Sequence, residues 1–185
     1  MERLVPSATA LLVVDLQEKL AAAMPEAMMA EVVKNAGILL ETAEALGVRV
    51  VASEQYPKGL GPTLTSVASK LGEMGVTPLS KMAFDACSEL TIARALADSG
   101  VKNVVVIGME AHVCVFQTAR ELVKRGYATY VVADAVASRR DENRRIGLSL
   151  CERAGAIVTS TETVAFDLLE HAGTGAFKTV SKLVR

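Results

Sequence analysis

The chain is poor in cysteine and histidine, with three and two residues respectively among 185. The cysteines, Cys87, Cys114 and Cys151, are widely spaced, odd in number and free of any CxxC pair. This pattern argues against a disulfide framework and against a thiolate metal site. We therefore expect reduced cysteines and a cytoplasmic location.

The sequence also lacks an excess of charge of one sign, with 20 Lys and Arg against 21 Asp and Glu. Nothing in this balance marks a surface for nucleic acid or for an anionic membrane. No apolar stretch approaches the length of a membrane span, and residues 1–6 lack the layout of a signal peptide. We expect neither a nucleic-acid partner nor a membrane partner.

One basic cluster stands out within this balanced composition. A nuclease or an RNA-binding protein would use such a cluster, but two neighbouring acidic residues dilute its charge and no aromatic stacking motif accompanies it. A solvated helix face or a subunit contact is the favoured interpretation. The cluster consists of Arg139, Arg140, Arg144 and Arg145.

Half of the residues are hydrophobic, which suits one domain with a full core over residues 1–185. Short β-branched runs alternate with longer segments rich in alanine and leucine, a pattern typical of βαβ units. We predict an α/β fold, a three-layer α/β/α sandwich around a mainly parallel six-stranded sheet. The predicted strands are residues 10–14, 48–52, 76–80, 103–107, 128–133 and 157–159.

The segments between these strands are predicted to be helices and loops. Residues 53–62, which contain two prolines and two glycines, are predicted to be a loop. Residues 108–114 are predicted to form a turn that opens the third helix. The predicted helices are about 25–46, 88–99, the segment from this turn to 125, about 141–154, and one more after 161, before a less regular terminus.

Three polar residues stand at the carboxyl ends of predicted strands or in the turn that follows one. Asp15 follows the first strand, Lys81 follows the third, and Cys114 lies in the turn after the fourth. In open α/β sheets, ligands bind beyond the carboxyl ends of the strands. We therefore expect Asp15, Lys81 and Cys114 to lie on one rim, together with the loop that begins at Ser53.

Cys114 is a candidate nucleophile because it is predicted to lie in the first turn of a helix. The free N–H groups and the helix dipole there stabilise a thiolate, and the same N–H groups can stabilise an oxyanion. The alternative is that Cys114 is one more small buried hydrophobic residue. Cys87 and Cys151 have no comparable setting and are assigned to packing.

A thiol nucleophile needs a group that takes its proton and returns it to the leaving group. Asp15 is a lone carboxylate at the end of an apolar strand, and Lys81 is a candidate partner for its charge. In isolation, Asp15 could instead be a helix cap or a turn residue, and Lys81 a solvated lysine. Their convergence at strand ends favours the catalytic interpretation.

Three segments resemble the motif blocks of the isochorismatase-like cysteine hydrolases. They are residues 11–17, read as LLVVDLQ, residues 81–84, read as KMAF, and residues 108–118, read as GMEAHVCVFQT. The blocks occur in order and span nearly the whole chain. Residues 54–63, read as EQYPKGLGPT, and residues 176–183 resemble the subgroup of isochorismatase domain-containing proteins.

The resemblance implies a role for each motif residue. Cys114 is the nucleophile, Asp15 the general acid and base, and Lys81 the charge partner that links them. The backbone N–H groups of Cys114 and Glu110 form the oxyanion hole, and a cis peptide joins Met109 to Glu110. Relatives commonly form dimers or larger assemblies, and the apolar segments 21–30 and 111–119 suggest a buried oligomer surface.

The resemblance also narrows the set of reactions that we expect for this chain. Nicotinamidases of the superfamily bind zinc through a D-x-H pattern after the second strand, where this chain reads SEQY at residues 53–56. With so few nitrogen and oxygen ligands, we expect no metal and no other cofactor. Isochorismatases proper do not depend on a cysteine at this position, so Cys114 points away from their reaction.

The substrate pocket is predicted less sharply. Four candidates, each of which could equally belong to the core or the rim, are Gln55, Tyr56, Phe84 and Phe116. The fifth candidate is His112, which could equally be a turn histidine whose ring is hydrogen-bonded by backbone groups. The favoured function is cysteine-dependent hydrolysis of an amide or related C–N bond in a small molecule, through a thioester. The alternatives are a binding or scaffold protein that keeps the fold and, from an old family label, RNA cleavage.

Overall fold

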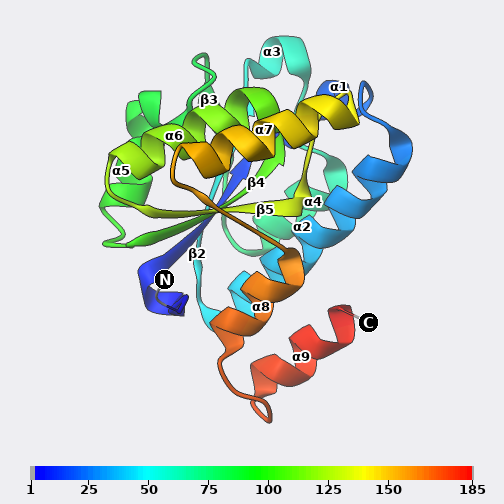
Figure 1. Cartoon of the computed structure of the whole chain (residues 1–185). Coiled ribbons are helices and arrows are strands. Elements are labelled where there is room, and N and C mark those ends of the chain that lie inside the picture. Colours follow the sequence, from blue (N-terminus) through cyan, green and yellow to red (C-terminus); the bar gives the residue numbers. More distant parts are fainter. Residues whose placement is uncertain (1–2, 185) are drawn as a thin grey trace.

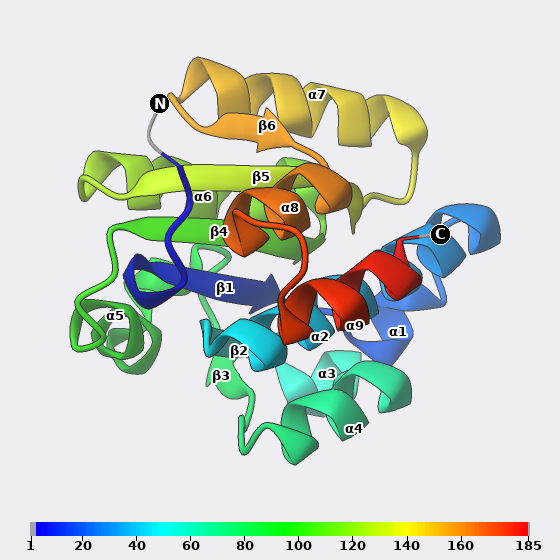
Figure 2. The same cartoon turned by 90° about the horizontal axis from the view of Figure 1, so that it is seen from below.

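Six strands form one sheet at the centre of the fold. The computed structural model describes residues 3–184. The strands lie side by side in the order β3-β2-β1-β4-β5-β6 (Figure 2), and all neighbours are parallel. The predicted six-stranded α/β fold is confirmed. The strands are β1 Thr9–Val14, β2 Arg49–Gln55, β3 Leu79–Lys81, β4 Asn103–Met109, β5 Ala128–Ala137 and β6 Ile157–Thr159.

The central strand β1 shows why these residues form a sheet covered on both faces. All six of its residues are buried. Leu11 and Val13 pack in the core on one face, while Leu12 and Val14 pack in the core on the other. Such a continuous apolar run is typical of a parallel strand with helices on both sides.

Helices cover both faces of the sheet and make the predicted three layers (Figure 1). Helices α2, α4 and α8 pack on one face, and α5, α6 and α7 pack on the other. The bounds are α1 Glu18–Ala21, α2 Glu26–Leu46, α3 Pro57–Leu60, α4 Thr65–Glu73, α5 Leu90–Ala97, α6 Phe116–Lys124, α7 Asp141–Arg153, α8 Thr161–Leu169 and α9 Gly175–Leu183. Shorter turns are Pro6–Ala8, Ala86–Ser88 and the π-helical turn Ala111–Val115.

The prediction for residues 53–62 is partly wrong. Strand β2 continues to Gln55, and residues 57–60 form one helical turn, α3. The polar side chains at the end of β2 have buried partners that the sequence does not reveal. Glu54, for example, accepts hydrogen bonds of 2.7 Å from both the N–H and the hydroxyl of Thr63.

Other boundaries also differ from the prediction. Strand β3 lies at Leu79–Lys81 instead of 76–80, and β5 continues to Ala137. The helix predicted at 88–99 covers only Leu90–Ala97, and the sequence reading missed α1 and α4. Only two residues of α4, Val67 and Leu71, are buried, so its amphipathic signal is short.

The tail after residue 161 contains two helices instead of the single helix predicted. Helix α9 packs beside α8 (Figure 2), and Val180 joins Ala165 and Leu169 in a small apolar cluster. Within residues 3–184, no helix is both long enough and apolar enough to cross a membrane.

The strand order reverses between β1 and β4, since the chain builds outward from β1 in one direction and later from β4 in the other. Such a switch point leaves a crevice outside the carboxyl ends of the two strands, where open α/β sheets bind ligands. Asp15 directly follows β1, and the turn that holds Cys114 follows β4. The topology therefore places both candidate residues at the switch point.

Candidate active site

Asp15 lies at a sharp bend where the chain leaves β1. Its N–H donates to the carbonyl of Ser53 on β2 at 3.1 Å, and its own carbonyl accepts from Gln17 N–H at 2.8 Å. Its φ angle is 51°, in the left-handed region that residues other than glycine seldom adopt. A backbone of this kind concentrates at functional sites, where the surrounding structure enforces it.

The Asp15 carboxylate forms an ion pair with Lys81 in the interior. Lys81 Nζ lies 2.8 Å from Asp15 Oδ2, and neither side chain is exposed to solvent. Ser53 Oγ donates to the other carboxylate oxygen at 2.7 Å. Burying two charges is costly, and here the cost is offset by the pairing of the charges and by the hydrogen bond from Ser53.

The Lys81 ammonium is surrounded by acceptors beyond Asp15. It donates to Gln55 Oε1 at 2.6 Å and to the carbonyls of Ala83 and Phe84, each at 3.1 Å. Gln55 Nε2 in turn donates to the carbonyl of Met82 at 2.8 Å. The ammonium is therefore fixed in place, and it holds the backbone of the segment that follows it.

Gln17 aligns Gln55 within this network. Its Oε1 accepts from Gln55 N–H at 2.7 Å, and its Nε2 donates to the carbonyls of Gln55 and Gly61 at 3.0 and 2.7 Å. Sequence reasoning missed the roles of Gln17 and Ser53. The signal that could have found Ser53 is the register of the sheet, since it lies opposite Val14, next to Asp15.

Gly108 allows β4 to approach β1 beside Asp15. Its φ is 124°, and a Cβ atom at this position would lie 1.9 Å from the carbonyl oxygen of Val14. Only glycine fits such a close approach of two backbones. Three residues later the chain enters the turn Ala111–Val115, which carries Cys114.

The Cys114 thiol is buried beside the ion pair. The pKa of Cys114 is raised to about 12, first by burial and then by the negative charge and hydrogen bonding of Asp15, while Lys81 acts in the opposite direction and lowers it. The sequence led us to expect a thiolate stabilised by the helix terminus. The structure corrects this expectation, because desolvation of the charged form outweighs the favourable charges and keeps the resting group a thiol.

The segment that precedes Cys114 is held from the side of β5. The peptide between Met109 and Glu110 is cis, at the position that the resemblance implied. Arg139 Nε lies 3.1 Å from Glu110 Oε2, and His112 Nδ1 lies 3.0 Å from Ser138 Oγ. Glu110 and His112 are thus fixed by residues that follow β5.

Comparisons with known proteins decide the family. Residues 9–163 match the isochorismatase domain. The chain belongs to the isochorismatase family. It is 34% identical to isochorismatase domain-containing protein 2 of Danio rerio over 98% of this chain and 89% of the relative, which confirms the predicted subgroup.

Solved structures agree with this membership of the isochorismatase family. A structure named MAR1 ribonuclease, from Caenorhabditis elegans, is 36% identical, has a TM-score of 0.91, and aligns over 99% of this chain and 92% of its own. YcaC of Escherichia coli, described as an octameric hydrolase of unknown specificity, has a TM-score of 0.88 over 98% of this chain and 90% of its own. At 19% identity, YcaC shows the shared fold alone.

The predicted pocket residues of this isochorismatase-family chain do not share one environment. Gln55 is buried and points inward to Lys81, so its assignment to the pocket wall is replaced by a role in the Lys81 network. Tyr56 and Phe84 are exposed, by 47% and 53%. Phe116 is half-buried, with the guanidinium carbon of Arg120 5.1 Å from its ring centroid.

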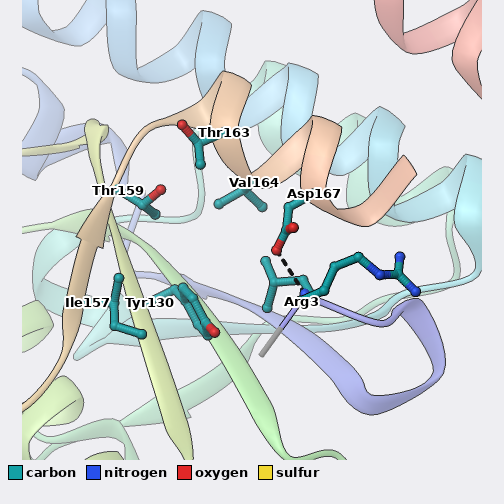
Figure 3. A pocket seen from close by; sticks show the side chains of 8 residues that line it. Arg3, Tyr130, Ile157, Thr159, Thr163, Val164 and Asp167 are labelled. Carbon is teal, nitrogen blue, oxygen red and sulfur yellow. Dashed lines mark hydrogen bonds between the residues drawn. The ribbon is translucent and has the colours of Figure 1, made fainter. Parts of the chain in front are cut away.

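A cavity of about 340 Å³ lies away from Asp15, Lys81 and Cys114 (Figure 3). Tyr130 and Ile157 from the sheet face Val164 and Asp167 from α8 across it. The Asp167 carboxylate accepts a hydrogen bond of 2.8 Å from the N–H of Leu4. None of these three residues, Asp15, Lys81 and Cys114, lines this cavity.

The described part of the chain holds no cluster of metal-ligating side chains. Within residues 3–184, no three or more His, Cys, Asp or Glu side chains are grouped so that they could hold a metal ion. The chemistry that the site offers from its own residues is therefore that of a thiol, a carboxylate and an ammonium.

Proposed function

We propose that this chain is a cysteine-dependent hydrolase that cleaves the amide or a related C–N bond of a small molecule. The observation that carries the proposal is the fully buried ion pair of Lys81 and Asp15 beside the buried thiol of Cys114. A buried charged pair that acts on a neighbouring thiol, at the switch point of an α/β sheet, is typical of a catalytic site.

The first half of the reaction forms a thioester. Asp15 takes the proton of Cys114 while the sulfur attacks the carbonyl carbon, so that a free thiolate need not accumulate. The N–H groups of Glu110 and Cys114 stabilise the resulting oxyanion. The C–N bond then breaks, and the proton on Asp15 passes to the leaving nitrogen.

The second half restores the enzyme. Water attacks the thioester carbonyl and gives a proton to Asp15, the C–S bond breaks, and Asp15 returns the proton to the Cys114 sulfur. Lys81 stays protonated throughout. Its positive charge offsets the negative charge that moves between the carboxylate and the sulfur. The buried position of Lys81 beside Asp15 suits this role.

Substitution of Cys114 tests the proposal. The wild type is incubated with a panel of aliphatic and aromatic primary amides, and released ammonia is measured. Cys114→Ala should lose at least about a thousandfold in kcat, because the nucleophile is absent. The matched control is Cys151→Ala, another buried cysteine, which should keep its activity. Ammonia release by Cys114→Ala at the wild-type rate would overturn the proposal.

A non-catalytic binding protein is the second candidate, and the raised pKa of Cys114 is the observation that favours it. A buried thiol with a pKa of about 12 is unreactive unless a base assists it. This candidate predicts that neither the wild type nor any Cys114 variant forms a covalent thioester with an amide or activated ester. Detection of the thioester by intact mass in the wild type alone would exclude it.

RNA cleavage has weaker support here. Several solved relatives carry the name ribonuclease, but the basic cluster of this chain is largely occupied by contacts within the chain. Arg139 pairs with Glu110, Arg145 pairs with Asp141, and Arg144 donates to the backbone of β5. We therefore propose a small-molecule substrate instead of a nucleic acid.

We further propose a cytoplasmic homo-oligomer. The apolar residues of segment 111–119 pack into the chain's own core, so they do not form the predicted subunit surface. The segment 21–30 lines a groove of about 470 Å³, together with Val33 and Leu64. Molar mass from light scattering of the purified protein tests the proposal, and a monomer at working concentration would contradict it.

A further inference from the structure

Glu110 brings a negative charge to the segment that forms the proposed oxyanion hole. Its side chain is only 8% exposed, and its carbonyl accepts hydrogen bonds from the N–H groups of Val113 and Val115 at 3.0 and 3.2 Å. The residue is therefore built into the turn that carries Cys114. An uncompensated carboxylate there would oppose the negative charge that develops on the substrate oxygen.

Arg139 compensates this charge from a separate element. Both its backbone N–H, at 3.2 Å, and its Nε, at 3.1 Å, donate to Glu110 Oε2. The pKa of Arg139 is raised, first by the hydrogen bond and then by the charge of Glu110. The neighbouring Ser138, which is fully buried, holds His112 through the contact of 3.0 Å.

Helix α7, which follows this segment, fixes the same turn from its other side. A Cβ atom at Gly147 would lie 2.5 Å from the carbonyl carbon of Ala111 and 2.6 Å from the nitrogen of His112. The helix backbone thus touches the backbone of the turn directly. The other charges of the site, Asp15 and Lys81, already compensate each other, so Arg139 is the partner that Glu110 depends on.

We propose that Ser138 and Arg139 are positioning residues of the hydrolase site: they clamp residues 110–112, and Arg139 neutralises Glu110 so that no net negative charge faces the reacting carbonyl. This inference rests on the proposed function. The proposed role of Arg139 differs from a purely structural one, because its effect depends on the charge of Glu110. Removing that charge should therefore compensate for removing Arg139.

A set of variants separates the effect of the Glu110 charge from a structural effect of Arg139. Arg139→Gln leaves Glu110 unpaired and should lower kcat about tenfold with little change in KM. Adding Glu110→Gln to it should recover several-fold of that loss, and Arg139→Lys should retain most of the activity. The matched control is Arg145→Gln, an exposed arginine on α7 that pairs with Asp141 instead.

A second readout needs no substrate, so it distinguishes failure of this inference from failure of the proposed function. The rate of Cys114 alkylation by iodoacetamide at pH 8 should fall several-fold in Arg139→Gln, because an unpaired carboxylate disfavours the thiolate, and should recover in the double variant. Equal rates in Arg139→Gln and Arg145→Gln would overturn the inference. So would a double variant that is no faster than Arg139→Gln.

Discussion

The Lys81 side chain contributes to folding and to chemistry through the same contacts. Its ammonium is unexposed and reaches Asp15, Gln55 and two backbone carbonyls. Because the three N–H groups of the ammonium already donate to Gln55 and to the two carbonyls, none is left to bind a substrate group. In the proposed reaction, its contribution is a fixed positive charge beside the Asp15 carboxylate, which transfers the proton.

Loss of this charge should be costly. Lys81→Met leaves the Asp15 carboxylate buried without a partner and should lower the free energy of unfolding by about 3–5 kcal/mol. Urea denaturation measures the loss. The matched control is Lys70→Met, since Lys70 pairs with glutamates at the surface and should lose about 1 kcal/mol or less. Equal losses in the two variants would contradict the account of the buried pair.

Individual residues were predictable to different extents. Asp15, Lys81 and Cys114 could be singled out because each follows a predicted strand and belongs to a motif. Ser53 and Gln17 could not, since their importance depends on which residues of distant strands lie opposite one another. The pKa of Cys114 could not be predicted from the sequence either, because the balance between burial and neighbouring charges depends on the packing around the sulfur.

At the scale of elements, close backbone contacts position Cys114, the proposed nucleophile. Gly108 brings β4 against β1, and Gly147 brings α7 against the turn Ala111–Val115. The sequence predicted the strand, the turn and the helix, but not that two glycines permit their contact. The end of β2 was missed for a related reason, since a local pattern of glycine and proline does not show the hydrogen bonds that Gln55 makes with Gln17 and Lys81.

Gly147→Ala should disturb the turn directly. The added methyl group meets the backbone of Ala111 at 2.5 Å and should cost about 1–3 kcal/mol of stability. The matched control is Gly37→Ala in α2, where nothing lies within 4 Å, and it should instead stabilise by about 0.5–1 kcal/mol. Thermal unfolding of both variants checks the prediction, and a Gly147→Ala protein as stable as Gly37→Ala would refute the close contact.

At the scale of the whole molecule, the parallel sheet turns three distant segments into one site. The alternation of β-branched and alanine-rich segments was enough to predict the six strands and the layers of helices. The order of the strands then determines which carboxyl ends are neighbours, and the reversal between β1 and β4 brings Asp15 and Cys114 together. The substrate was not predictable, because specificity depends on the shape of the pocket and on loops whose geometry a sequence does not show, such as those that carry the exposed residues Tyr56 and Phe84.

The central claim is that the charges of Asp15 and Lys81 act together on the pKa of the Cys114 thiol. The most direct test is the pH dependence of Cys114 alkylation by iodoacetamide in a Cys87→Ala, Cys151→Ala background, where Cys114 is the only cysteine. With a pKa of about 12, the rate should rise about tenfold per pH unit from pH 7 to pH 10 without a plateau.

Asp15→Asn in this background should shift the rate profile to lower pH, because the carboxylate raises the thiol pKa, and Lys81→Met should shift it to higher pH. Asp167→Asn, which changes a carboxylate bonded to Leu4 instead, serves as the control and should leave the profile unchanged. Opposite shifts in Asp15→Asn and Lys81→Met are the result that the account predicts. A profile that neither substitution moves would contradict it.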